Sequence, residues 1–251
     1  MRLILLFTFI LFYFTFFSQT PKYKVISLNS GLSITSITRS NIQGAPFGAL
    51  SSLSGSLTYE HYYENGLFLG TALFYNPRGE QTTFTWTDQN GKITGDGKTK
   101  FQYNYVSLPL KVGYYFGNKF LGVINGGILP SYLVSLTEVS KNIYTIDGEL
   151  IEKAKETTSD IGNFNRFDLA GIVELSIGRR VGKRLWIIFS ASYQHSFTNI
   201  TDQNIFNLNS YHYGVTSALG VKYLWKWKRE DKVINAYYYP GYFPSTPING
   251  G

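Results

Sequence analysis

The chain has 251 residues and a formal net charge of +7, and it is rich in Gly (25), Tyr (20) and Phe (19) while it contains no Cys. The absence of Cys excludes disulfide bonds and thiolate zinc sites. The positive charges are scattered and do not form a cluster, so the composition does not indicate nucleic-acid binding.

The N-terminal residues have the pattern of an export signal. Arg2 precedes an apolar run from Leu3 to Phe17, and a polar stretch begins at Ser18. A basic start, a short apolar run and a polar end are typical of a secretory signal peptide. A membrane anchor is the alternative, but the run is shorter than the roughly 20 residues that a spanning helix needs. We therefore predict a signal peptide at 1–18, a folded domain at 19–227 and a periplasmic tail at 228–251.

Alternation of apolar with small or polar residues recurs along the exported chain and predicts β-strands. The predicted strands are 24–37, 46–62, 66–85, 98–116, 119–138, 164–180, 184–198 and 211–227. They are longer than the five or six residues usual in soluble proteins. A tilted strand needs about 9–11 residues to cross a bilayer, so these segments are long enough to span one.

The connections between these strands alternate in length. Short turns with Gly or Asn ("ENG", "GN" and "VGK") alternate with long connectors such as "TDQNGKITGDG" and the stretch 140–163. Tight periplasmic turns and longer outer loops are typical of outer-membrane barrels. The sequence thus predicts an all-β fold, an eight-stranded antiparallel up-and-down transmembrane β-barrel.

A soluble β-sandwich would show the same alternation and is the rival fold. Aromatic residues near the strand ends favour the membrane barrel, because they resemble the girdles at membrane interfaces. The residues expected in these girdles are Tyr62, Tyr63, Tyr114, Tyr115, Trp186, Tyr223, Trp225 and Trp227.

Three stretches of the chain resemble a known family. They are "ALFYNPRGEQ" (72–81), "YNYVSLPLKVGYYFG" (103–117) and "GGILPSYLV" (126–134). Together they resemble the PorT-like outer-membrane β-barrel family of Bacteroidota. The matching positions are Tyr75 with Gly79, Tyr105 with Pro109 and Leu110, and Gly127 with Ser131 and Tyr132. The resemblance implies an eight-stranded barrel in the outer membrane. Most members have no assigned activity, and the namesake is linked to type IX protein secretion and gliding.

Five charged residues occupy alternate strand positions whose side chains would point into the barrel: Glu60, Lys111, Asp168, Glu174 and Lys222. Buried charges must be paired, and an eight-stranded barrel has room for little besides side chains. We therefore expect a polar network that plugs the lumen, with Lys111 paired to Glu174 or Glu60. A narrow ion or proton path is the alternative.

Pro109 is unusual within a predicted strand, because proline has no N–H to donate to a sheet. Proline normally lies on edge strands, and a closed barrel has no edge. We predict a bulge or a local break in pairing beside Pro109.

The search for catalytic or metal-binding residues finds little. His195 and Ser196 are similar in residue type to the His/Ser pair of lipid A deacylase barrels. Adjacent strand residues point to opposite faces, so these two cannot form a base–nucleophile pair in a regular strand. The three His residues are isolated in sequence and match no metal-ligand spacing. We expect no enzyme activity, no metal and no cofactor, and the alternative is a lipid-modifying enzyme or a small pore.

Two segments are candidates for partner binding. The connector 140–163 includes "GELIEKAKET", which is compatible with a helix because Glu149 and Lys153 are four residues apart. It is either a solvated outer loop or a contact for lipopolysaccharide or an envelope protein. The tail is either a disordered end or a docking segment. Its candidate partner-binding residues are Tyr237, Tyr238, Tyr239, Tyr242 and Phe243. We expect a structural or interaction component of the envelope, embedded in outer-membrane lipid.

Overall fold

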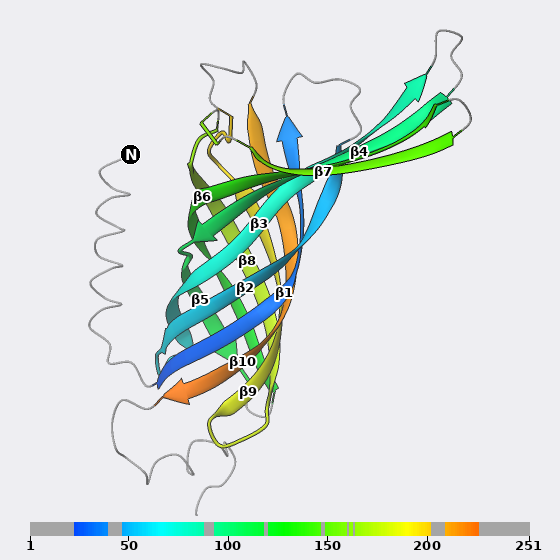
Figure 1. Cartoon of the computed structure of the whole chain (residues 1–251). Helices are drawn as coiled ribbons and strands as arrows, with labels where there is room; N and C mark the ends of the chain where they lie inside the picture. The colour runs from blue at the N-terminus through cyan, green and yellow to red at the C-terminus, as the bar shows by residue number, and fades with distance from the viewer. Residues whose placement is uncertain are drawn as a thin grey trace, which may run out of the picture.

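The computed structural model describes residues 23–39, 47–87, 93–117, 120–146, 149–159, 161–162, 164–201 and 209–225 (Figure 1). The predicted signal peptide and the predicted tail lie outside these residues. The described residues form ten strands. They are β1 (Tyr23–Arg39), β2 (Phe47–Tyr62), β3 (Leu67–Thr87), β4 (Ile93–Ser107), β5 (Leu110–Phe116), β6 (Phe120–Ile146), β7 (Glu149–Ser159), β8 (Phe167–Arg180), β9 (Leu185–Ser196) and β10 (Ser210–Trp225). Among these residues there is no helix that is long and apolar enough to cross a membrane.

The strands close into a ring of antiparallel neighbours. β1 pairs with β2 on one side and with β10 on the other, and the remaining neighbours follow chain order around the ring. β4 and β5 occupy one position between β3 and β6, so the ring has eight positions. The predicted eight-stranded up-and-down barrel is confirmed.

Pro109 breaks the pairing, as predicted. β4 ends at Ser107 and β5 begins at Leu110. The register against β3 is the same on both sides of the gap, because Phe74 faces Ser107 and Thr71 faces Leu110. Proline therefore interrupts the ladder without shifting it. On the other side, the N–H of Leu108 still donates to the carbonyl of Pro130 at 2.9 Å.

The outer face of the barrel is apolar. The alternate residues from Val106 to Phe116 that form the apolar face of the predicted strand are each 37–56% exposed. The same alternation is present on β8 and β10, where Val173, Leu175, Val215 and Leu219 are exposed. In an aqueous environment such a continuous belt would be costly, whereas a lipid bilayer stabilises it.

Four of the eight residues predicted for the aromatic girdles are buried or partly buried and do not face lipid. Tyr62, Tyr63 and Trp186 are each only 5% exposed, and Tyr115 is partly buried beside them. Tyr114, Tyr223 and Trp225 do lie on the outer face; Trp227 lies outside the described residues. The girdle prediction was therefore wrong for the buried residues. Position near a strand end does not decide the direction of a side chain, because neighbouring residues alternate between the two faces.

The sheet continues beyond the ring on the side of the long connectors, which in outer-membrane barrels is the cell exterior. β2 begins at Phe47, opposite Thr82, so β3 extends past it. The projecting parts of β3, β4 and β6 stay paired with one another, and β7 pairs with β6 from Leu136 to Ile146 (Figure 1). We call residues 83–87, 93–100 and 136–146, together with β7, the extracellular arm.

β7 lies where the sequence is compatible with a helix. The segment Glu149–Ser159 is a strand, so the helical interpretation of "GELIEKAKET" was wrong. A single Glu–Lys pair four residues apart stabilises a helix by only about 0.2–0.5 kcal/mol. The hydrogen-bonded ladder that β7 forms with β6 along its whole length of 11 residues outweighs this local preference.

Candidate functional site: the closed lumen

Two lysine–glutamate pairs lie in the periplasmic half of the lumen. The Nζ atom of Lys222 (β10) is 2.7 Å from Oε2 of Glu60 (β2), and the pair reaches across the inner face of β1. The hydroxyl of Tyr62 also donates to Glu60 at 3.0 Å. Both charged side chains are 8% exposed, so the pair is shielded from solvent.

The second pair joins β5 to β8 across β6. Nζ of Lys111 is 2.7 Å from Oε2 of Glu174, and Asn125 donates to the other carboxylate oxygen at 3.0 Å. The sequence alone leaves both Glu174 and Glu60 open as partners of Lys111. Glu174 takes this position, and Glu60 is held by Lys222 instead.

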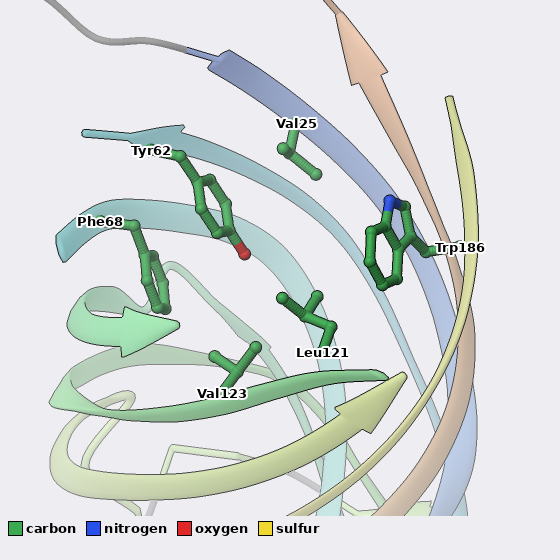
Figure 2. Packing of buried hydrophobic residues seen from close by; sticks show 6 residues of the cluster. All are labelled: Val25, Tyr62, Phe68, Leu121, Val123 and Trp186. Carbon is green, nitrogen blue, oxygen red and sulfur yellow. The ribbon is translucent and has the colours of Figure 1, made fainter. Parts of the chain in front are cut away.

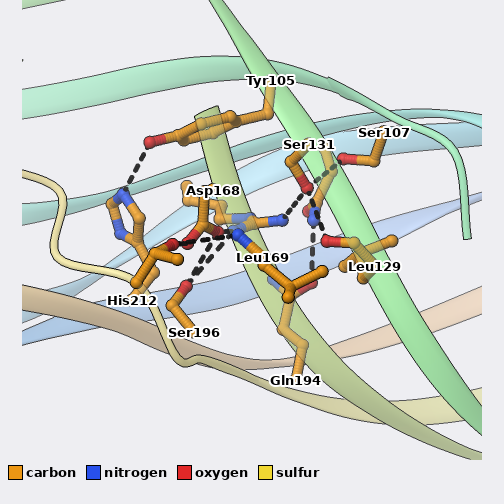
Figure 3. Close-up of polar contacts among 12 residues, drawn as sticks. Tyr105, Ser107, Leu129, Ser131, Asp168, Leu169, Gln194, Ser196 and His212 are labelled. Carbon is orange, nitrogen blue, oxygen red and sulfur yellow. Dashed lines mark hydrogen bonds and ion pairs between the residues drawn. The ribbon is translucent and has the colours of Figure 1, made fainter. Parts of the chain in front are cut away.

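A third ion pair lies in the outer half and is fully buried. Arg78 (β3) is paired with Asp168 (β8), and its guanidinium lies 4.7 Å from the ring centroid of Tyr105. Arg78 also donates to Oγ of Ser131 at 2.8 Å. Asp168 accepts a further hydrogen bond from Ser196 at 2.9 Å (Figure 3) and another from Thr198 at 2.6 Å.

Arg78 was not among the residues predicted from sequence. It lies in "NPRGE", where Pro77 and Gly79 resemble a turn and hide the strand alternation. The signal present in the sequence is the alternation of faces along the strand, because Phe74, Asn76 and Arg78 are alternate residues of β3 and all point inward. The amide of Asn76 is best oriented with its oxygen toward Nε of Arg78, which lies 3.0 Å away.

His195 and Ser196 do not form a nucleophile and base. His195 is exposed on the outer face, whereas Ser196 is 1% exposed and donates to Asp168. The hydroxyl that would have been a nucleophile therefore belongs to the Arg78–Asp168 network. Within the described part of the chain, no group of three or more His, Asp or Glu side chains is arranged to hold a metal ion.

Apolar clusters lie inside the lumen near both ends. The periplasmic cluster contains Val25, Tyr62, Phe68, Leu121, Val123 and Trp186, which point toward one another inside the ring (Figure 2). The outer cluster contains Ile37, Tyr103, Tyr105, Leu133, Leu136 and Ile200, with Phe164 packed against it. Strands from opposite sides of the ring contribute to each cluster, so apolar side chains meet across the lumen near both ends.

Between the two clusters lies a polar cavity of about 50 Å³. Both lysine–glutamate pairs line it, together with hydroxyl side chains from β2, β8, β9 and β10. Such a volume has room for a few water molecules, and the hydroxyl groups supply their hydrogen-bond partners. The arrangement can hold water and charge in a fixed network. The cavity lies between the two apolar clusters.

Replacing Lys111 by Met should destabilise the barrel by about 1–3 kcal/mol, because Glu174 would keep only neutral hydrogen-bond donors. Heat-dependent gel mobility of the unboiled protein measures this change. The matched control is Val112→Met, which changes the adjacent lipid-facing residue. Equal melting of the Lys111→Met variant and the wild type would show that the ion pair contributes nothing.

The closed antiparallel ring, its apolar outer face and its polar interior define a small outer-membrane β-barrel protein. The comparison with protein-family models agrees: residues 17–202 match the family described as "Outer membrane protein beta-barrel domain". The chain belongs to this family, and the outer membrane is therefore its location.

Solved structures of other small barrels are similar to this chain at low sequence identity. Neisserial surface protein A is 10% identical, with 79% of this chain and 96% of that chain covered and a TM-score of 0.38. OprG from Pseudomonas aeruginosa is 12% identical, with coverages of 83% and 98% and a TM-score of 0.40. Ail of Yersinia pestis is 13% identical, with coverages of 80% and 98% and a TM-score of 0.33. A search of curated proteins found no significant match.

Proposed function

We propose that the protein is a non-conducting, non-enzymatic interaction component of the outer membrane, in which the barrel anchors the extracellular arm. The packing of apolar clusters and ion pairs inside the lumen is the observation that carries this proposal. An ion crossing the barrel would have to displace the periplasmic cluster around Trp186 and the outer cluster around Ile200. It would also have to pass the buried charges of Arg78 and Asp168.

The enzyme alternative lacks support from the geometry of its best candidate. A nucleophile must lie within hydrogen-bond reach of its base. Ser196 instead donates a hydrogen bond to the carboxylate of Asp168, which is paired with Arg78, and His195 lies on the opposite face of β9.

The process in which the protein takes part is proposed from the family resemblance. The Pro109 strand and the stretches beside it resemble the PorT-like branch of these barrels, and this supports a role in protein secretion or gliding. The tail 228–251, with its aromatic residues 237–239, 242 and 243, is proposed as a second partner contact on the periplasmic side.

Conductance across planar bilayers tests the closed lumen. We expect that the purified barrel gives no current steps above the baseline at either polarity. An open general porin in the same bilayer shows that the assay detects conduction. Reproducible steps from this barrel that change when Lys222 is replaced by Met would establish a pore and overturn the proposal.

Gentle-detergent pull-downs test the interaction role and separate its two candidate contacts. One variant lacks residues 228–251, and another lacks residues 142–153, which shortens the β6–β7 hairpin between the paired residues Lys141 and Ala154. We expect each deletion to remove a different partner from the wild-type set. A partner set that is empty, or that neither deletion alters, would contradict the proposal.

A further inference from the structure

The turn between β8 and β9 is the most basic stretch of the described chain. Its sequence is "RRVGKR" (179–184), so four of its six residues carry a positive charge and none carries a negative one. The turn lies at the end of the barrel opposite the extracellular arm (Figure 1). This end carries the short turns, which in outer-membrane barrels face the periplasm.

The carbonyl groups of this turn are engaged by hydrogen bonds within the protein. Nε and Nη2 of Arg180 donate to the carbonyls of Gly182 at 2.9 Å and Lys183 at 2.7 Å. The carbonyl of Arg184 accepts from an N–H of β10 at 2.9 Å, and that of Leu185 accepts from two N–H groups of the turn at 3.0 and 3.2 Å. Four successive carbonyls are therefore occupied, so the turn presents cations rather than acceptors. These bonds also fix the backbone and preorganise the turn for a ligand.

The other three basic side chains of the turn are available to a ligand. Arg179, Lys183 and Arg184 are exposed, and none of them forms an ion pair with a carboxylate in the described part of the chain. Three cations on one short turn repel one another, and a bound anion relieves this repulsion. The turn thus has the electrostatic character of an anion-binding surface.

Negative charge is scarce at this end of the barrel. The described acidic side chains of the periplasmic half are Glu60 and Glu174, which are held by lysines inside the lumen, and Glu64. Glu64 lies on the turn between β2 and β3, on the opposite side of the ring from the β8–β9 turn. The sequence 226–232, which follows β10, adds four basic and two acidic residues, so it leaves the excess charge positive.

Arg179 lies where the turn meets the lipid-facing surface. It is the next outward residue of β8 after Ile177, which is exposed on the outer face. Its cross-strand neighbours are Phe120 on β6 and Ile187 on β9, and both are exposed on the same face. A long cationic side chain in such a position extends along the apolar surface to the headgroup level. A guanidinium group there can bind a phosphate with two parallel hydrogen bonds.

We propose that the β8–β9 turn binds the headgroup phosphate of an anionic phospholipid in the periplasmic leaflet, through Arg179, Lys183 and Arg184. The apolar side chains beside Arg179 would contact the acyl chains of the same lipid. A zwitterionic lipid brings an ammonium group, which the three cations repel, whereas an anionic headgroup is attracted. The inference concerns a site distant from the extracellular arm and does not rest on the proposed interaction role.

Native mass spectrometry of the purified full-length barrel in detergent measures lipid binding at this turn. The probes are phosphatidylglycerol and phosphatidylcholine with identical acyl chains, so they differ only in the headgroup. We expect phosphatidylglycerol to bind about tenfold more tightly or better, since each basic residue near an anionic lipid surface contributes about fivefold. Inorganic phosphate should not displace the bound lipid, because it lacks the acyl chains.

A triple variant tests the three side chains. Arg179→Gln with Lys183→Gln and Arg184→Gln should bind the two lipids equally. The matched control removes the same charge from the extracellular arm, by replacing three of its lysines with Gln: Lys98, Lys100 and Lys155. This control should keep the wild-type preference. A barrel that lacks residues 228–251 should also keep it.

Several outcomes would overturn the inference. They are equal binding of the two lipids to the wild type, or equal effects of the turn variant and the arm control. Loss of the preference on removal of the tail would place the site in residues 228–251 instead. Displacement of the lipid by inorganic phosphate would make the turn a site for free phosphate. The comparison of lipids uses the wild-type protein alone, so the test remains decisive if the triple variant fails to fold.

Discussion

Replacing Asp168 by Ala should lower the free energy of unfolding by about 3–5 kcal/mol, which is the usual cost of removing one partner of a buried ion pair. Arg78 is 0% exposed and would keep its charge inside the barrel with only neutral partners such as Ser131. Ser196 and Thr198 would also lose the carboxylate to which they donate. Urea unfolding of the barrel in lipid vesicles, followed by tryptophan fluorescence, measures the change.

The control for this prediction removes both charges. Arg78→Met combined with Asp168→Leu should be less destabilised than Asp168→Ala, because no unpaired charge remains inside. Together with the single variants Arg78→Met and Asp168→Leu, a double-mutant cycle gives the coupling energy between the two residues. If Asp168→Ala unfolds at the same urea concentration as the wild type, the pair does not stabilise the barrel.

Replacing Trp186 by Ala should cost about 3–5 kcal/mol, because the change leaves a cavity in the cluster that fills the periplasmic mouth. Trp186 is 5% exposed and packs with Phe68, Leu121 and the other residues of that cluster. The temperature at which unboiled protein changes its gel mobility measures the loss without depending on tryptophan fluorescence.

Trp225→Ala is the matched control for Trp186. It makes the same chemical change on a residue that is 56% exposed on the outer face near the same end of the barrel. We expect a smaller loss for Trp225→Ala, since lipid can fill the space. Equal losses for the two variants would contradict a packing role for the periplasmic cluster.

The ring itself was predictable from sequence because two different solvents act on each strand. Lipid on one side and a crowded polar interior on the other impose a period of two, and this period is clear from Val106 to Phe116 and on β10. Pro109 was informative for a related reason: a closed ring has no edge strand, so the absent N–H had to break the ladder.

Features that depend on distant neighbours were not predictable in the same way. β7 has a sequence compatible with a helix, and only the projecting part of β6 makes it a strand. The partners of Arg78 come from β6, β8 and β9, far from it in sequence. The inward direction of Trp186 depends on the register of β9 against β8 and β10, which the periodicity of one strand does not determine.

Two strands of the extracellular arm continue into the barrel wall. β3 and β6 run without interruption from the membrane wall into the arm, whereas the β4 path is broken near its lower end at Pro109. A force applied to the arm along these strands would therefore act in shear on many backbone hydrogen bonds of the barrel wall at once. We expect β3 and β6 to carry most of a mechanical load on the arm.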